Sequence, residues 1–398
     1  LPLAYLTAVL FSMMSSIIFN VENPEMLFDF RYGIVSAVVC FVAIFSIQKA
    51  TQRSTILKAG MMVSLFASLT LVSIMLLNQD YGLRSLMISF AFTIFSGLLT
   101  AILVIGLLPF FEVAFGILSS VKLVELSNPN HPLLRKLLTE TPGTYHHSVM
   151  VGNLAETAAE SIGANGLLCR VGSFYHDIGK TKRPQYFIEN QANRENPHDH
   201  IDPSLSKSII IAHARDGVEM LKEYKIPKQI CDIAEQHHGT TLLKYFYHKA
   251  LKQREENPDG TEEVREEDYR YPGPKAQTKE AAIVGISDCV EAAVRSLKKP
   301  TMEQIDLMVD KIIKDRLDDN QFNECDLTLK ELDTISRTLK KTLLGIFHSR
   351  IEYPDLPDKK ERSGGGRAGQ AADPEIAAGS GGNNGENPID GQEGNVRI

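Results

Sequence analysis

The sequence predicts an all-α protein: a helical transmembrane bundle, then an all-helical cytoplasmic domain, then a disordered C-terminal tail. Three observations predict this order. The first 120 or so of the 398 residues form long apolar blocks, whereas nearly all charged residues lie beyond Leu126. From Pro132 onward apolar residues recur at helical spacing without strand-like alternation. After about Tyr353 large apolar side chains are too scarce to bury a core. We therefore expect a transmembrane region at 1–120, a cytoplasmic domain at 121–353 and a tail at 354–398.

The predicted membrane region contains four apolar stretches. They run over Leu3–Phe19, Tyr32–Ile47, Leu57–Leu77 and Leu86–Ser119. The last two exceed the roughly 18 residues that indicate a bilayer span, and the first two come close. We treat the fourth as one long span, with Gly106 and Pro109 as places where it could kink. Because the chain opens at Leu1 directly into an apolar block, we expect an N-terminal part to be missing.

Loop charge predicts the orientation of these spans. The loop from Gln48 to Lys58 carries three basic residues and no acid, whereas the loop from Asn20 to Arg31 is acidic. The positive-inside rule makes the basic loop cytoplasmic, and two further spans then keep the C-terminal domain in the cytosol. No charged residue lies deep in a span, which disfavours a transporter and leaves an anchor or a sensor open.

The predicted cytoplasmic domain is a succession of amphipathic helices, several of which begin with Pro or Thr. A surface loop is expected at Glu255–Lys275, which is rich in Pro, Gly and charge. The expected helices are Pro132–Thr139, Tyr145–Ile162, Gly166–Ile178, Pro203–Tyr224, Pro227–His238, Thr240–Arg254, Thr278–Leu297, Thr301–Arg316 and Thr328–Arg350.

Composition limits the partners. A net charge of −7 without a long basic tract argues against general nucleic-acid binding. The five Cys are scattered without a CxxC pair, as suits reduced cytosolic thiols. The expected partners are therefore membrane lipid and a nucleotide-sized anion held by a metal site, and the sequence is compatible with a homodimer.

Seven residues of the soluble half carry the predicted chemistry. Each lies on an apolar helical face, as His147 does beside Val151 and Leu154. One buried His would be weak evidence, but this many unpaired polar groups would cost roughly 2 to 7 kcal/mol each. A shared cation removes that cost, and helical bundles build metal centres in this way. The predicted ligands are His147, His176, Asp177, His213, His237, His238 and Asp288.

Five imidazoles and two carboxylates exceed the needs of one tetrahedral zinc ion. They suffice for two divalent metal ions if Asp177 bridges them, since its two oxygens can each bind one ion. A His and carboxylate shell without thiolate favours Mn or Fe, with Zn, Ni and Co left open. Two metals about 3.5 to 4 Å apart are a recognised arrangement for phosphoester hydrolysis.

Lys180 lies one turn beyond His176, where its ammonium could stabilise charge on a phosphate oxygen. Asp177 and Lys180 are thus the predicted catalytic residues, and Arg183 is a weaker candidate expected on the surface. His146 is expected to face away from the site. The loop histidines His198 and His200 could close over a substrate, although such residues are usually solvated.

These residues match a known pattern. The segment HDIGKTKRPQYFIENQ, with TPGTYHHSVMVGNLAE before it and EQHHGTT and YPGPKAQTKEAA after it, resembles the HD-domain phosphohydrolase superfamily, and in particular its 7TM-HD family. The resemblance covers about Phe90 to His348, and all seven ligand positions are filled.

The resemblance implies a cytoplasmic helical HD domain joined to seven spans in a bacterial membrane, of which the four here would be the last. It implies hydrolysis of cyclic di-AMP to linear 5′-pApA at a di-iron or di-manganese site. It assigns one metal to His147, His176, Asp177 and Asp288, and the other to Asp177, His213, His237 and His238.

Three other functions stay open. An HD-GYP-type enzyme acting on cyclic di-GMP would carry a downstream GYP where this chain reads HHGTTLLKYF. An HD hydrolase of a mononucleotide or of guanosine tetraphosphate is compatible with the same metal shell, because the shell does not choose the base. A membrane receptor that binds nucleotide without hydrolysis is disfavoured by the complete ligand set.

Overall fold

The computed structural model describes residues 2–18, 30–48, 50–77, 82–191, 194–256, 263–297 and 300–347. The tail expected at 354–398 and most of the acidic loop lie outside these residues. Within them the structure is all-helical, apart from an isolated β-bridge between Leu242 and Arg270, so the predicted fold class is confirmed.

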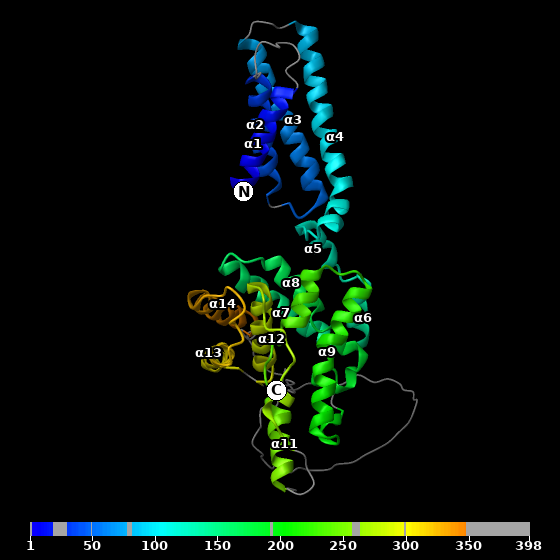
Figure 1. The fold of residues 1–398 in the computed structure, drawn as a ribbon, viewed down its shortest axis with the longest axis vertical. Helices are drawn as coiled ribbons and strands as arrows, with labels where there is room; N and C mark the ends of the chain where they lie inside the picture. The colour runs from blue at the N-terminus through cyan, green and yellow to red at the C-terminus, as the bar shows by residue number, and fades with distance from the viewer. Residues whose placement is uncertain are drawn as a thin grey trace, which may run out of the picture.

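The apolar half forms four helices at one end of an elongated molecule (Figure 1). Two of them, α3 and α4, are long and apolar enough to cross a membrane, and α1 and α2 are shorter apolar helices. Large apolar side chains point outward, as Phe11 and Phe45 do at 70% exposure each. The fourth apolar stretch is one continuous helix despite Pro109, as predicted. The helices are α1 (Pro2–Ile18), α2 (Phe30–Ile47), α3 (Arg53–Leu77) and α4 (Leu83–Phe115).

A short helix that the sequence analysis missed, α5 (Ser120–Leu126), lies between the apolar helices and the rest of the chain (Figure 1). The Ser119 side chain caps it by accepting a hydrogen bond from the backbone N–H of Lys122. Glu125 of α5 pairs with Arg53 at the start of α3, with 2.5 Å between the charged atoms. On its other face Leu123 and Leu126 are buried in the helical domain.

All nine helices predicted for the soluble half occur. Their observed bounds are α6 (Pro132–Glu140), α7 (Pro142–Ser161), α8 (Gly166–Tyr175), α9 (Pro203–Glu223), α10 (Lys228–Gln236), α11 (Lys244–Glu256), α12 (Lys279–Arg295), α13 (Met302–Asp318) and α14 (Leu329–Phe347). Short 3₁₀ turns connect them at η1 (Ile178–Lys182), η2 (Pro184–Tyr186), η3 (Ile188–Asn190), η4 (Pro197–Asp199) and η5 (Glu266–Tyr269).

Two details differ from the prediction. Helices α8 and α10 end earlier than expected, so His176 and His237 are their C-cap residues rather than interior positions. The segment expected as a surface loop at Glu255–Lys275 folds back at its end, where Tyr271 donates its backbone N–H to Thr241 and is buried.

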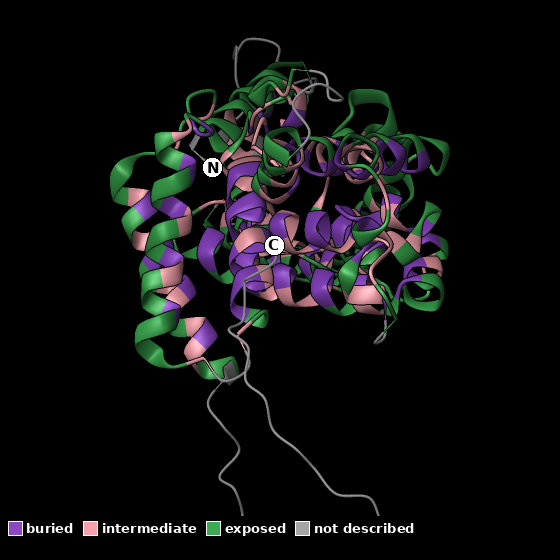
Figure 2. Cartoon of the chain, turned by 90° about the horizontal axis from the view of Figure 1, so that it is seen from below, coloured by how far each residue is buried: buried purple, intermediate pink, exposed green. Residues whose placement is uncertain are grey.

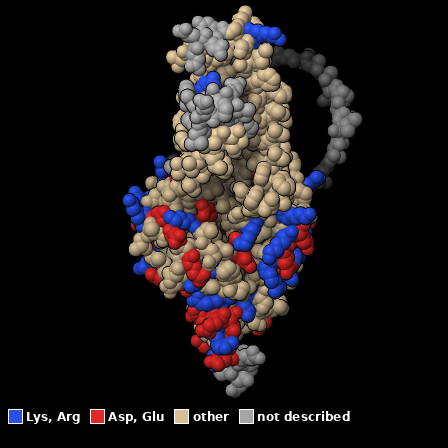
Figure 3. Space-filling model, turned by 45° about the horizontal axis from the view of Figure 1, so that its top comes forward, with Lys and Arg blue, Asp and Glu red and all other residues tan. Residues whose placement is uncertain are grey.

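Helices α7 and α12 form the centre of the domain. One apolar cluster joins them to α13 and α14, and a second joins α5, α6, α8, α9 and α10. Figure 2 shows the buried residues on the inward faces of the helices and the exposed ones outside. In Figure 3 the charged side chains gather on the helical domain, while the apolar helices are almost bare of them. This contrast agrees with the two environments inferred from the sequence.

Candidate metal centre

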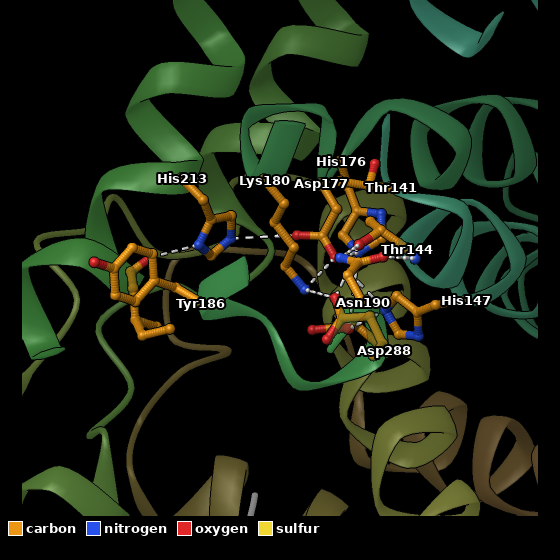
Figure 4. A network of polar contacts seen from close by, with 12 residues as sticks. Thr141, Thr144, His147, His176, Asp177, Lys180, Tyr186, Asn190, His213 and Asp288 are labelled. Atoms are coloured by element: carbon orange, nitrogen blue, oxygen red, sulfur yellow. Dashed lines mark hydrogen bonds and ion pairs between the residues drawn. The ribbon is translucent and has the colours of Figure 1, made fainter. Parts of the chain in front are cut away.

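The seven predicted ligands meet between five elements of the helical domain. Helix α7 supplies His147, α9 supplies His213 and α12 supplies Asp288, whereas the two adjacent pairs follow the ends of α8 and α10. Their ligand atoms form two groups, and within each group all the atoms lie within 4.8 Å of one another. The first group is His147, His176, Asp177 and Asp288, and the second is Asp177, His213, His237 and His238. Asp177 belongs to both, and Figure 4 shows it between His213 and the first group.

Four of the histidine rings are oriented by a hydrogen bond at Nδ1, the ring nitrogen that faces away from the site. The Nδ1 atom of His147 pairs with the carboxylate of Glu291, which leaves Nε2 directed at the site, 2.9 Å from Asp288. Fixing Nδ1 as a donor leaves the Nε2 lone pair free for a metal. Three other rings donate Nδ1–H to the carbonyl oxygen three residues earlier, namely His176 to Ser173 at 2.7 Å, His213 to Ile210 at 2.5 Å and His237 to Ala234 at 2.8 Å.

These residues fit divalent metal ions. The Nε2 atoms of His176 and His237 and both carboxylate oxygens of Asp177 are buried, and among the described residues none of these atoms makes a well-directed hydrogen bond. Native interiors seldom leave buried polar atoms in this state, and cations at both groups would satisfy them.

Charge in the site favours cations. Burial lowers the pKa of His237 to about 3, so the ring is neutral and can act as a ligand. Burial would also lower the pKa of His176, but the carboxylates of Asp177 and Asp288 outweigh it and raise the value to about 10. Without a metal its Nε2 atom therefore carries a proton, which the ring would release to bind a metal. The pKa of Asp177 stays well below its ordinary range, because His176 and Lys180 outweigh the effect of burial. The pKa of Asp288 is also well below its ordinary range, because the hydrogen bonds of His147 and His176 outweigh the effect of burial. Two ionised carboxylates therefore attract positive charge into a buried space.

Lys180 reaches the edge of this centre. Its Nζ atom lies 2.8 Å from Asp177 and 2.9 Å from Glu189, and 5.1 Å from the centre of the Phe187 ring. Although burial would lower the pKa of Lys180, Asp177 and Glu189 outweigh it and raise the pKa, which keeps the ammonium charged. Lys180 therefore lies beside Asp177, and its catalytic role stays a prediction.

The weaker candidates lie elsewhere. Arg183 pairs with Asp216 at 3.1 Å rather than with a predicted ligand, and His146 is exposed, both as expected. His200 is exposed, but His198 is not solvated. The residue is 4% exposed and its ring packs against Phe246, which corrects the expectation for a loop histidine.

Three site residues were missed by sequence reasoning. Glu291 lies three positions after Asp288, and this helical spacing could have revealed it. Tyr271 stacks on His238 with 4.2 Å between ring centres, but no local sequence pattern predicts that contact. Glu189 was within a quoted motif, yet its contact with Lys180 depends on the path of the turns between them.

Two family models match the chain. The HD domain matches residues 144–293, and the model described as 7TM receptor with intracellular HD hydrolase matches residues 2–119. The first match contains all seven predicted ligands, and the second contains α1 to α4.

Curated relatives agree with these matches. The Cyclic-di-AMP phosphodiesterase PgpH of Bacillus subtilis (strain 168) is 53% identical over 359 residues, which cover 90% of this chain and 49% of the relative. The protein of the same name from Listeria monocytogenes serotype 1/2a (strain 10403S) is 50% identical, over 83% of this chain and 46% of the relative. The chain thus spans about half the length of the curated relatives it matches.

Solved structures show that the chain is also similar to its relatives in fold. The crystal structure of the L. monocytogenes phosphodiesterase PgpH HD domain is 59% identical, covers 55% of this chain and all of that chain, and has a TM-score of 0.52. The structure of that domain in complex with cyclic-di-AMP is 61% identical, with 56% and 100% coverage and the same TM-score. The chain therefore belongs to the family of 7TM receptors with an intracellular HD hydrolase.

Proposed function

We propose that this chain is a metal-dependent phosphodiesterase that hydrolyses cyclic di-AMP to 5′-pApA. The observation that carries the proposal is the pair of ligand groups that share Asp177, in a domain 61% identical to one crystallised with cyclic-di-AMP. The proposed metals are two Mn or two Fe ions, held by the two groups described above. When bound, such ions supply a nucleophile from water at neutral pH and positive charge for the phosphate oxygens.

The protein's own groups have distinct tasks in this proposal. Asp177 joins the two ligand groups, and four of the five histidines, all except His238, keep Nε2 directed inward through their Nδ1 hydrogen bonds. The Lys180 ammonium, beside Asp177, binds a non-bridging phosphate oxygen and stabilises the charge that builds up there in the transition state. The Lys180 side chain is only 13% exposed, and its charge interacts more strongly there than it would in bulk water.

We also propose where the reaction takes place. Helices α1 to α4 within residues 1–120 lie in a bacterial cell membrane in contact with lipid, which suits their outward apolar side chains. Residues 121–353 then form the cytoplasmic HD domain, with α5 at the membrane surface. The basic segment around Arg53 and Lys58 supports this orientation.

The test uses the full chain in detergent, loaded with Mn(II) or Fe(II) and incubated separately with cyclic di-AMP and cyclic di-GMP. Chromatography resolves the products, and Asp177→Ala is compared with Asp306→Ala, a change at an exposed carboxylate of α13. We expect pApA from cyclic di-AMP with the wild type and with Asp306→Ala only. Bound metal without turnover of either nucleotide would overturn the proposal, and preference for cyclic di-GMP would overturn the assigned substrate.

A further inference from the structure

Glu189 is a buried carboxylate at the edge of the metal centre, in the turn η3. Its side chain is 7% exposed. Within the described residues its side-chain hydrogen bonds join it to Lys180 and Thr144: Oε1 accepts from the ammonium at 2.9 Å and from the hydroxyl at 3.0 Å. Glu189 is therefore tied to the catalytic lysine rather than to a proposed metal ligand.

The turn that carries Glu189 is fixed to the first turn of α7. Asn190 accepts from the backbone N–H of Thr144 at 3.2 Å and donates to its hydroxyl at 2.9 Å, as the dashed lines around these residues in Figure 4 indicate. The backbone carbonyl of Glu189 also packs directly on Gly143, where a Cβ would lie 1.9 Å from that oxygen. Since His147 follows one turn later, Glu189 holds a fixed position relative to a proposed ligand.

Lys180 needs such a partner. Its ammonium is largely buried, and a buried charge is costly unless it is paired. Asp177 is one partner, but its oxygens are the ones expected to bind the metals. Glu189 is the other carboxylate that pairs closely with the ammonium among the described residues, while the Phe187 ring at 5.1 Å restricts it from another side.

We propose that Glu189 is a positioning residue that aims the Lys180 ammonium at the phosphate-binding side of the metal centre, with Thr144 and Asn190 holding Glu189 in place. This inference rests on the proposed function, because it takes the phosphate-binding role of Lys180 as given. A side chain pre-set by hydrogen bonds loses less freedom on meeting the phosphate, so its charge stabilises the transition state more fully.

The test is a double-mutant cycle in the full chain. Glu189→Gln keeps the shape and can still accept from Thr144, but it removes the charge that holds Lys180. We expect kcat to fall about 10- to 100-fold with KM changed less than about 2-fold, and Lys180→Met to lower kcat about 100- to 1,000-fold. In the Lys180→Met background, Glu189→Gln is expected to cause no further loss.

Two readouts distinguish positioning from general damage. Metal content, measured by elemental analysis, is expected to stay at the wild-type level in Glu189→Gln, because Glu189 is not a proposed ligand. The terminal phosphate of pApA carries more negative charge than the phosphodiester of the substrate, so its affinity reports on the Lys180 ammonium even where KM does not. This affinity, measured by calorimetry on the metal-loaded protein, is expected to fall in both single variants without adding in the double variant. The control is Glu195→Gln, a change at a carboxylate that is 92% exposed a few residues away, and it should match the wild type in every readout.

The outcomes separate this inference from the proposed function. A wild type that binds pApA but turns over neither cyclic dinucleotide refutes the proposed function. In that case the pApA affinities of the single and double variants still test the positioning role of Glu189. Losses that add in the double variant, or metal lost from Glu189→Gln, would overturn the positioning role.

Discussion

Gly179 lies directly against the backbone carbonyl of His213. A Cβ placed on Gly179 would come within 2.0 Å of that oxygen and 2.6 Å of the backbone nitrogen of Gly217. Turn η1 therefore packs backbone to backbone on α9, and this approach brings Asp177, two residues before Gly179, to the second ligand group. Only a residue without a side chain allows the two groups to share one carboxylate.

Gly179→Ala is expected to force η1 away from α9 and so to separate His213 from Asp177. We expect less bound metal per chain than in the wild type and a free energy of unfolding lower by about 1 to 3 kcal/mol, the usual cost of overpacking. Elemental analysis and thermal melts followed by circular dichroism would measure both. Gly345→Ala is the control, because a Cβ there meets nothing within 4 Å. Unchanged metal content in Gly179→Ala would contradict this account of the turn.

Glu291→Gln tests the orientation of His147. The carboxylate of Glu291 pairs with Nδ1 of His147 and lies 3.8 Å from Arg295 on the same helix. Replacing it by an amide weakens the hold on the ring, and loss of such a partner typically lowers metal affinity about 10- to 100-fold. Competition with a chelator measures the affinity, with Glu303→Gln, an exposed residue in the first turn of α13, as the control. Equal affinities in the two variants would show that Glu291 does not orient the ligand.

Tyr175→Phe tests the junction between α8 and α5. The Tyr175 hydroxyl is buried and donates to the backbone carbonyl of Leu126 at 2.7 Å. Without it that buried carbonyl is unpaired, at a cost of about 1 to 3 kcal/mol. We expect a lower midpoint in a thermal melt, whereas Tyr224→Phe, at a residue 48% exposed, should leave the midpoint within error. A Tyr175→Phe midpoint equal to that of the wild type would mean that this hydrogen bond adds no net stability.

Much of the fold follows from local pattern. Pro at the start of α6 and α9 and Thr before α12 and α13 predicted those helices within a few residues, because capping acts locally. Helix α5 was missed because seven residues, two of them charged, are too few to show a helical period after the apolar stretch that ends at Ser119. The end of α8 was placed too late because Ile178 extends the apolar spacing beyond the helix, although the backbone has already turned at Asp177.

The candidate site divides in the same way. The seven proposed ligands could be selected because buried polar residues on apolar helical faces are conspicuous in a sequence. Glu189 and Tyr271 could not be selected from the sequence, since their contacts depend on the path that the segments between the helices take back to the metal centre. His198 shows the opposite error: its polar neighbours predicted a solvated loop, whereas the ring is packed between Tyr186 and Phe246.

That packing gives His198 an effect on stability that depends on pH. Its Nε2–H donates to the carbonyl of Tyr186 at 2.9 Å, and burial lowers the pKa of the ring below its ordinary 6.5. The unfolded chain therefore takes up this proton at a higher pH than the folded one. The stabilising contribution is present above about pH 6.5 and is lost as the pH falls toward the folded-state pKa.

His198→Phe keeps a ring between Tyr186 and Phe246 but cannot titrate. We expect the variant to lose the hydrogen bond to Tyr186, yet to show a smaller fall in melting temperature between about pH 7.5 and about pH 5.5 than the wild type. His200→Gln, a change at a neighbouring histidine that is 70% exposed, should retain the wild-type pH dependence. Thermal melts of the metal-loaded full chain in detergent would measure the three curves. If the His198→Phe and wild-type curves run parallel over this range, the burial of His198 does not contribute to the acid sensitivity of the domain.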